Sequence, residues 1–281
     1  MSGSISGISV LDIGRRPKAS TRDGRAWTVL SPAEDRTRVE VAFREIDGGR
    51  THQISSGDRT QVAYLIDGAD ITLTHTTSGG TTSHAAGAHC GVYLEPGEDA
   101  TITSTNGPLT LLMVSVPKYA DRAARREVPA GYVFDESHLR AFVDENLLRE
   151  RTFWVNTETG LSDSWDLQIG RMRYVPNGYS PRHVHHPSAT SKVTPEHFYL
   201  IERGRGEVRH DWGAMAVGPG SLVLIPAGEW HQLVASDTGL DYIEFQAPFD
   251  FETTMNDPRG KHWYIKGTDD GTGRPKPWIQ S

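Results

Sequence analysis

Residues 178–186 read GYSPRHVHH, residues 196–208 read EHFYLIERGRGEV, and residues 218–231 read GPGSLVLIPAGEWH. His183 and His185 are separated by one residue, so on a strand, where successive side chains alternate faces, both point the same way. His197 and His231 each lie in a strand-like run of their own. Imidazole nitrogen is a good ligand for Zn, Cu, Fe and Ni. The four histidines therefore predict a metal site built on strands.

The spacing of these residues resembles the two motifs of the cupin family. The first motif is a glycine, a His-x-His pair, a Glu or His, and a glycine seven positions later; it fits Gly178, His183, His185, His197 and Gly204. The second motif is a glycine, five residues, Pro-x-Gly, two residues and a histidine; it fits Gly220, Pro226, Gly228 and His231. The first gap is one residue shorter than usual and the loop before His197 is longer. The resemblance implies a metal-binding β-barrel and covers about a fifth of the chain.

One position departs from the commonest form of the motif. Most cupins place a glutamate seven residues before the motif glycine, where this chain has His197, with Glu196 beside it. Strand phase points His197 inward together with Tyr199 and Ile201. A β-bulge could instead turn Glu196 inward. With His197 as the fourth ligand, all four ligands are neutral and the metal keeps its full charge.

The whole chain limits the class of protein. It has 281 residues, a net charge of −7 and one cysteine, Cys90, so it can form one large or two ordinary domains and no internal disulfide. No basic stripe points to nucleic acid, and no run of 18 apolar residues points to a membrane span. The N-terminus lacks the charged start and apolar core of a signal peptide. We expect a cytoplasmic protein.

Short β-branched or alternating runs dominate the first half of the chain and predict strands in a sandwich or barrel. They are Val39–Phe43, Val62–Ile66, Ile71–His75, Gly91–Leu94, Thr101–Ser104 and Leu109–Val116. A helix is predicted next, because Asp135-Glu136-Ser137 can cap one and Leu139, Phe142, Val143 and Leu147 follow at helical spacing. Strand signals resume at Phe153 and continue to about Phe245.

The two β halves are weakly related. QVAYLIDG at 61–68 parallels HFYLIERG at 197–204, which aligns Gln61 with His197, and a similar match through Pro96 and Pro226 aligns Thr101 with His231. The first half therefore reads as a cupin barrel without metal ligands. We predict an all-β protein of two tandem cupin (double-stranded β-helix, jelly-roll) barrels with a short helical linker. The expected parts are an N-terminal arm (1–30), a degenerate barrel (31–116), the linker (117–150), a metal-binding barrel (151–252) and a C-terminal tail (253–281).

This layout is similar to that of the (S)-ureidoglycine aminohydrolases, in which the second barrel also holds the metal and the Glu position is also a histidine. That family has a glutamate as the first ligand and a glutamine as the last, where this chain has His183 and His231. The resemblance implies architecture more than substrate. The tail carries Trp263, Tyr264 and Trp278, which favour contact with the other domain or a second subunit, with disorder as the alternative for 267–276.

Four protein ligands leave two neighbouring positions open on a six-coordinate metal. We expect one divalent transition metal, Fe, Mn, Ni or Cu, with Zn disfavoured because structural Zn is usually four-coordinate.

Arg171 and Arg173 share one strand face, and one of them, Arg173 in our assignment, could clamp a substrate carboxylate. Tyr199 is a candidate proton donor, or it only fills the barrel. Glu244 and Gln246 share one face of residues 241–246, opposite Ile243 and Phe245, and phase does not decide which face lines the pocket; we assign Glu244 as a catalytic residue.

Three functions fit this site. The all-histidine ligand set favours a dioxygenase-type oxidoreductase acting on a small polar, carboxylate-bearing molecule. The alternative is non-redox chemistry with a Mn-type ion, as a hydrolase, aminohydrolase, isomerase or lyase. The third is a non-catalytic cupin that binds metal or ligand. The expected partners are a small-molecule substrate and a second copy of the chain in a homodimer, with no nucleic acid and no membrane.

Overall fold

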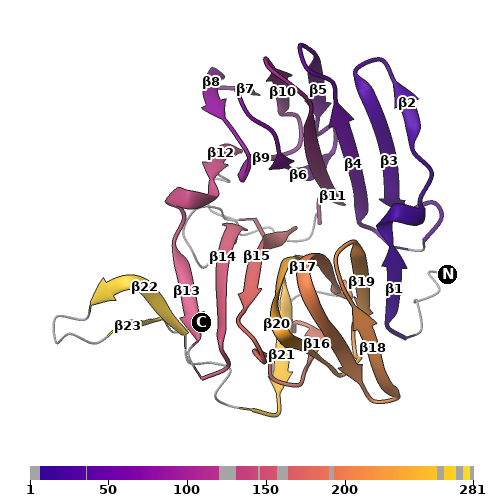
Figure 1. Ribbon diagram of the computed structural model, residues 1–281, viewed down its shortest axis with the longest axis vertical. Helices are drawn as coiled ribbons and strands as arrows, with labels where there is room; N and C mark the ends of the chain where they lie inside the picture. Colours follow the sequence, from indigo (N-terminus) through magenta and orange to yellow (C-terminus); the bar gives the residue numbers. More distant parts are fainter. Residues whose placement is uncertain are drawn as a thin grey trace. The chain divides into compact units, whose positions relative to one another are not determined.

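The computed structural model describes residues 7–35, 37–119, 131–144, 146–156, 164–189, 193–257, 263–269 and 275–278, the last two ranges by backbone alone. The chain divides into two compact units (Figure 1). Gly14–Leu139 form the first unit, and Arg140–Ser281 form the second together with the first strand of the chain. No helix among the described residues is long and apolar enough to cross a membrane.

The first unit is built from antiparallel strands. They are β2 (Ala19–Thr21), β3 (Gly24–Leu30), β4 (Glu40–Ile46), β5 (Thr51–Ser55), β6 (Arg59–Asp67), β7 (Ile71–Thr77), β8 (Gly80–Ala86), β9 (Cys90–Leu94), β10 (Asp99–Ser104), β11 (Leu109–Pro117) and β12 (Tyr132–Asp135). Within the described residues they form a seven-stranded sheet, β12-β9-β6-β11-β4-β3-β2, and a four-stranded sheet, β5-β10-β7-β8. Every strand predicted in this half is present, within three residues at each end.

The second unit repeats this plan. Its strands are β1 (Ser9–Asp12), β13 (Ala141–Asp144), β14 (Arg149–Val155), β15 (Gln168–Tyr174), β16 (His183–Pro187), β17 (Glu196–His210), β18 (Gly213–Val217), β19 (Ser221–Pro226), β20 (His231–Ala247), β21 (Phe251–Met255), β22 (Trp263–Asp269) and β23 (Pro275–Trp278). The order β19-β17-β20-β15-β14 matches β9-β6-β11-β4-β3 of the first unit. The described strands therefore agree with the internal repeat inferred from sequence.

The long strands β17 and β20 pair with each other along most of their length within the sheet of the second unit. Their pairing shifts register between Gly204 and Gly206, where the sheet bends. Gly204 has φ +77°, and a Cβ at this position would lie 2.1 Å from the carbonyl oxygen of Gly239. The first motif thus needs glycine here for two reasons, a left-handed backbone and a close approach of two chains.

The glycine of the second motif joins the two histidine-bearing segments. Gly228 has φ +84° and lies in the turn between β19 and β20. Its N–H donates to the carbonyl oxygen of His185 at 3.0 Å. This turn fixes the start of β20, and hence His231, against β16.

The predicted helix over residues 137–149 does not form. Asp135 caps only the 3-10 turn η2 (Glu136–His138), and the chain then runs extended through β13, turns, and returns as β14. The turn is closed by Asp144, which accepts hydrogen bonds from Leu147 N–H and from the Arg149 guanidinium, while Leu148 adopts φ +57°. Phe142 on β13 and Leu147 in the turn are both buried, so two of the apolar residues that suggest a helix are accounted for by a strand and a turn.

The expected arm and tail also have other roles. Residues 24–30 form β3 of the first unit instead of an arm. In the tail, β21 pairs with β16, and β22 pairs with the free edge of β13, so the described parts of the tail extend the sheet of the second unit. Ile279 and residues 270–274 lie outside the described residues.

The first strand of the chain belongs to the second unit. β1, drawn in indigo, lies antiparallel to β19 (Figure 1), with Val10 opposite Val223. Ile8 and Val10 pack against the core of this unit. A strand from the start of the sequence therefore covers an edge that would otherwise expose unpaired backbone groups.

Deleting residues 1–12 should destabilise the second unit by about 2 kcal/mol, because the deletion removes partly buried apolar surface and one row of strand pairing. Deleting residues 1–6 leaves β1 in place and serves as the control. Denaturant unfolding of the three proteins measures the difference. Equal stability of the two truncated proteins would show that β1 contributes nothing to the unit.

Candidate metal centre

Three strands bring the four histidines together. His183 and His185 lie on β16, His197 on β17, and His231 is the first residue of β20, directly opposite His183. All four are buried, and each offers a ring nitrogen within 4.8 Å of the others. Among the described residues, this is the one group of His, Cys, Asp and Glu side chains that could hold a metal ion.

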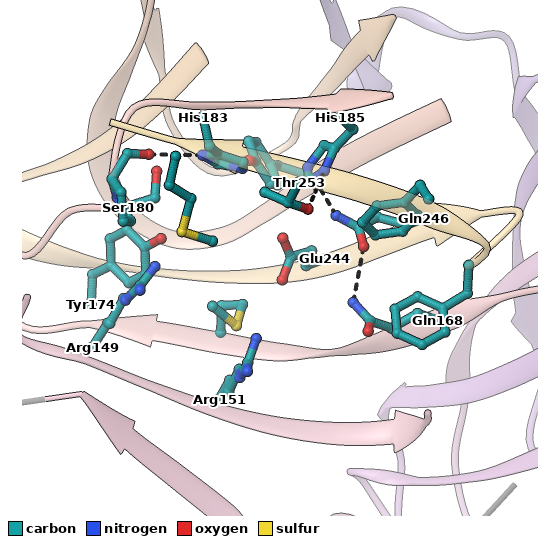
Figure 2. Close-up of a pocket in the computed structure, with 16 residues that line it drawn as sticks. Arg149, Arg151, Gln168, Tyr174, Ser180, His183, His185, Glu244, Gln246 and Thr253 are labelled. Atoms are coloured by element: carbon teal, nitrogen blue, oxygen red, sulfur yellow. Dashed lines mark hydrogen bonds between the residues drawn. The ribbon is translucent and has the colours of Figure 1, made fainter. Parts of the chain in front are cut away.

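Three of the rings are held through Nδ1. The Nδ1 of His183 lies 2.7 Å from the carbonyl oxygen of Pro181, and that of His231 lies 2.9 Å from the carbonyl oxygen of Glu229. The Nδ1 of His185 lies 3.0 Å from the hydroxyl of Thr253, which faces it across the β16–β21 pair (Figure 2). When Nδ1 donates a hydrogen bond, Nε2 keeps its lone pair for a ligand. With Nδ1 as the donor in each ring, the three Nε2 atoms would be the ligand atoms for a metal.

His197 is held the other way round. Its Nε2 lies 2.8 Å from the carboxylate of Glu244, and its Nδ1 lies 3.1 Å from Nε2 of His185. The nitrogen left for the cluster is Nδ1. Hydrogen bonding to a carboxylate makes an imidazole a more basic ligand. The carboxylate of Glu244 thus lies next to His197, which occupies the position where most cupins have a glutamate.

The residues fit a divalent transition metal. The Nε2 of His231 is fully buried and has no hydrogen-bond partner among the described residues, a state that a polar atom rarely keeps without a ligand. Burial, followed by the charge of His197, lowers the pKa of His183 to about 4, and burial also lowers the pKa of His185 and of His231 well below the usual range. Neutral imidazoles are the form that binds a metal.

The metal-free protein should lose stability as the pH falls from about 6.5 to about 4. In this window His183 is protonated in the unfolded chain and neutral in the folded one, so the unfolded state binds more protons and is favoured by acid. The loss from His183 alone is roughly 3 kcal/mol. Denaturant unfolding of the chelator-treated protein at pH 7, 6, 5 and 4 measures it. Replacing His183 by glutamine should flatten this slope, whereas His186→Ala, an exposed neighbour on the same strand, should not.

The strand phase predicted for His197 is confirmed. His197 and Tyr199 point into the unit, their ring centroids 4.6 Å apart, and Phe198 points to the other face, stacked on Phe245. Glu196 is only half-buried and is not part of the ligand group, so no bulge turns it inward.

A cavity of about 70 Å³ adjoins the histidines. It has room for about five water molecules, or for a ligand of similar size. His183, His185 and Tyr199 form part of its wall. Glu244 lies between the histidines and Arg151 (Figure 2), with 14% of its side chain exposed. The remaining lining residues are Arg149, Gln168, Met172, Tyr174, Ser180, Pro181, Gln246, Phe249, Phe251, Thr253 and Met255.

The assignment of Arg173 was wrong. Arg173 is exposed and pairs with Asp241, and Arg171 pairs with Glu202 outside the pocket. The arginines that line the pocket are Arg149 and Arg151, which share one face of β14. Period-two alternation through RERTFWV indicates this face, but the helical spacing of the residues just before it favours a helix instead.

Tyr199 lies on the His197 face, as the strand phase predicts, and Glu244, whose face the sequence leaves open, lies opposite it on β20; both line the pocket. Burial alone would raise the pKa of Glu244, but the hydrogen bond and charge of His197, together with Arg151, lower it. Burial raises the pKa of Tyr199 well above its usual range, so its hydroxyl stays protonated. Gln246, on the same face as Glu244, also lines the pocket.

In the first unit the matching strand face carries other residues. Gln61, Ala63 and Leu65 on β6 correspond to His197, Tyr199 and Ile201 on β17. Ala63 and Leu65 belong to a continuous aliphatic core with residues such as Val92, Ile102 and Leu111. The absence of a metal from this unit stays a prediction, to be checked by metal stoichiometry.

Comparison with known proteins supports the resemblance to the cupin superfamily. Residues 177–250 match the model of the AraC-like ligand-binding domain family. The structure of oxalate decarboxylase from Lactobacillus farciminis, in complex with formate, superposes with a TM-score of 0.71 at 11% identity over 90% of each chain. A variant of the Bacillus subtilis oxalate decarboxylase gives a TM-score of 0.70 at 12% identity over 90% of this chain and 80% of that one.

A further structure of the Bacillus enzyme, solved in work on its Mn(II) centres, superposes equally well, with 12% identity and a TM-score of 0.70 over the same shares of the two chains. No curated protein matches the sequence. At these identities the structures establish the fold alone: an all-β chain with two cupin jelly-roll units.

Proposed function

We propose that this chain is a metal-dependent cupin enzyme that acts on a small carboxylate, with dioxygen as co-substrate. One observation carries the proposal: the group that could hold the metal consists of four buried imidazoles with no carboxylate among them, and the other charges of its pocket cancel in pairs. Arg149 pairs with Asp144, and Arg151 faces Glu244. A divalent ion on the histidines would therefore add two positive charges that nothing in this pocket balances. A small anion is the partner that such a buried site needs.

Each of three pocket residues would have its own role toward such an anion. Arg151, less than one-tenth exposed, would bind a carboxylate through its planar guanidinium. Glu244 would accept or return a proton, since it lies between Arg151 and the histidines. Tyr199 would hold a protonated hydroxyl against the ring of His197 and limit the room for water. A metal bound to the histidines would supply a Lewis acid and, for Fe or Cu, a centre able to react with dioxygen.

A non-redox reaction is the second candidate. Two observations favour it: Glu244 offers acid–base chemistry that needs no oxidant, and the superposed structures are Mn-containing or formate-bound decarboxylases. A lyase or decarboxylase, or a hydrolase of the aminohydrolase type, would use the same anion pocket with a Mn-type ion.

One experiment separates these functions. Protein freed of metal and reloaded with Fe(II), Mn(II), Ni(II) or Cu(II) is incubated with two- to four-carbon hydroxy, oxo and dicarboxylic acids, and oxygen uptake and product release are followed together. Oxygen uptake coupled to substrate loss supports the dioxygenase. Turnover in the absence of oxygen supports the second candidate. Binding without turnover in every case would identify a ligand-binding protein.

Replacing Arg151 by methionine should weaken binding of the substrate acid about 10-fold or more, since the variant loses a charged hydrogen bond of the kind that contributes on the order of 1.5–3 kcal/mol. Arg173→Met is the matched control, because Arg173 is exposed and outside the pocket, and its affinity should not change. Titration calorimetry with the acid found above measures both. An equal loss in the two variants would contradict the assignment of Arg151.

The homodimer and the cytoplasmic location are further proposals. Light scattering of the purified chain and fractionation of cells that express it test them.

A further inference from the structure

A row of buried side-chain amides leads to the metal centre. Asn156 follows β14, Gln168 begins β15, and Gln246 lies near the end of β20. Asn156 Nδ2 donates to Gln168 Oε1 at 2.6 Å, and Gln168 Nε2 donates to Gln246 Oε1 at 3.0 Å. Gln246 Nε2 lies 3.3 Å from Nε2 of His185 (Figure 2). All three amides are at least 95% buried.

This row, the amide relay of Asn156, Gln168 and Gln246, has a direction. The carbonyl oxygens of Gln168 and Gln246 each accept from the amide before them, so the NH₂ group of each amide faces the next member of the row or, at Gln246, His185. If Gln246 turned its amide over, two NH₂ groups would face each other and a buried hydrogen bond would be lost. The relay therefore holds Gln246 with its NH₂ group toward His185.

The acceptor that Gln246 now faces is a ligand atom. Nε2 of His185 gives its lone pair to a metal when one binds, because its Nδ1 is held by Thr253. The N–H of Gln246 then loses this acceptor and remains in the pocket wall beside the centre, where a buried donor needs another partner.

We propose that Gln246 is a specificity-determining residue whose amide N–H donates to an oxygen of the metal-bound ligand. The relay thereby selects ligands that present an acceptor oxygen, such as carboxylates, over ligands that present a donor. This inference rests on the proposed function and deepens it, since it names the atom of the substrate that the chain recognises.

Two small probes of similar size test the proposal on the Mn(II)-loaded full chain. Acetate presents acceptor oxygens, and imidazole binds a metal through one nitrogen and has only an N–H left. In the Gln246→Met variant, acetate affinity should fall about 10-fold or more, while imidazole affinity should change by less than about 2-fold. Gln168→Met, which releases the carbonyl of Gln246, should shift the same ratio in the same direction by a smaller amount.

The control is Gln232→Met, which removes a part-buried glutamine of the same unit that donates to the Ser180 carbonyl. Both affinities should be unchanged in it. Elemental analysis of every variant confirms the metal content before calorimetry. A parallel loss of acetate and imidazole, as a merely structural role predicts, overturns the donor assignment and leaves the proposed function intact. Wild-type protein that takes up no metal overturns both.

Discussion

Replacing His231 by alanine should abolish stoichiometric metal binding, and His183→Ala should do the same. Metal-binding free energies of four-ligand protein sites are on the order of 10–16 kcal/mol, so one ligand in four contributes roughly 3–4 kcal/mol, or a roughly 100- to 1000-fold loss of affinity. The effect should be largest at His231, whose buried Nε2 has no other partner in the part of the chain that the structure describes. Elemental analysis after dialysis measures it, and stoichiometric metal in both variants would falsify the site.

Two controls distinguish ligands from neighbours. His186→Ala removes an exposed histidine from the strand that carries His183 and His185, and it should keep full occupancy. Glu196→Gln removes the carboxylate next to His197, and occupancy should again be nearly unchanged, whereas His197→Ala should lower metal affinity 10-fold or more. The reverse ranking of these two variants would mean that β17 is in the wrong register.

Replacing Glu244 by glutamine should have two effects of different size. The hydrogen bond to His197 weakens, which should lower metal affinity about 10- to 100-fold. If Glu244 is also the acid–base group, turnover by the fully loaded enzyme should fall about 100- to 10,000-fold. Metal titration and single-turnover rates at saturating metal separate the two effects.

Glu202→Gln is the matched control for this variant. Glu202 pairs with Arg171 and its side chain is 16% exposed, close to the 14% of Glu244, but it lies outside the pocket. It should keep both metal affinity and turnover. If Glu244→Gln binds metal with normal affinity and loses only turnover, the hydrogen bond from His197 to Glu244 does not contribute to metal affinity.

The histidines could be predicted because strand periodicity is strict. Alternation places His183 and His185 on one face because they are two residues apart, and the resemblance to the cupin motif adds His197, seven residues before Gly204. The residues that hold the rings could not be predicted, since Pro181 and Glu229 act through backbone carbonyls, and Thr253 and Glu244 are brought in by pairing between distant strands.

Arg149 and Arg151 were missed for a different reason. Leu139, Phe142, Val143 and Leu147 are spaced by three and four residues, which suits one face of a helix, but a strand followed by a tight turn also buries Phe142 and Leu147. Local propensity could not choose between them, because the choice depends on the buried Asp144–Arg149 pair and on pairing with β15 and β22. The resulting strand carries both arginines into the pocket.

The position of β1 has a consequence for how the protein is made. On the ribosome, residues 9–12 emerge before their partner β19, which spans Ser221–Pro226 and follows more than 200 residues later. The second unit cannot close its edge until most of the chain has been synthesised, although the first unit can fold earlier. A fragment that begins at residue 140 would leave the β19 edge open to pairing between copies, so it should aggregate during expression where the full chain does not.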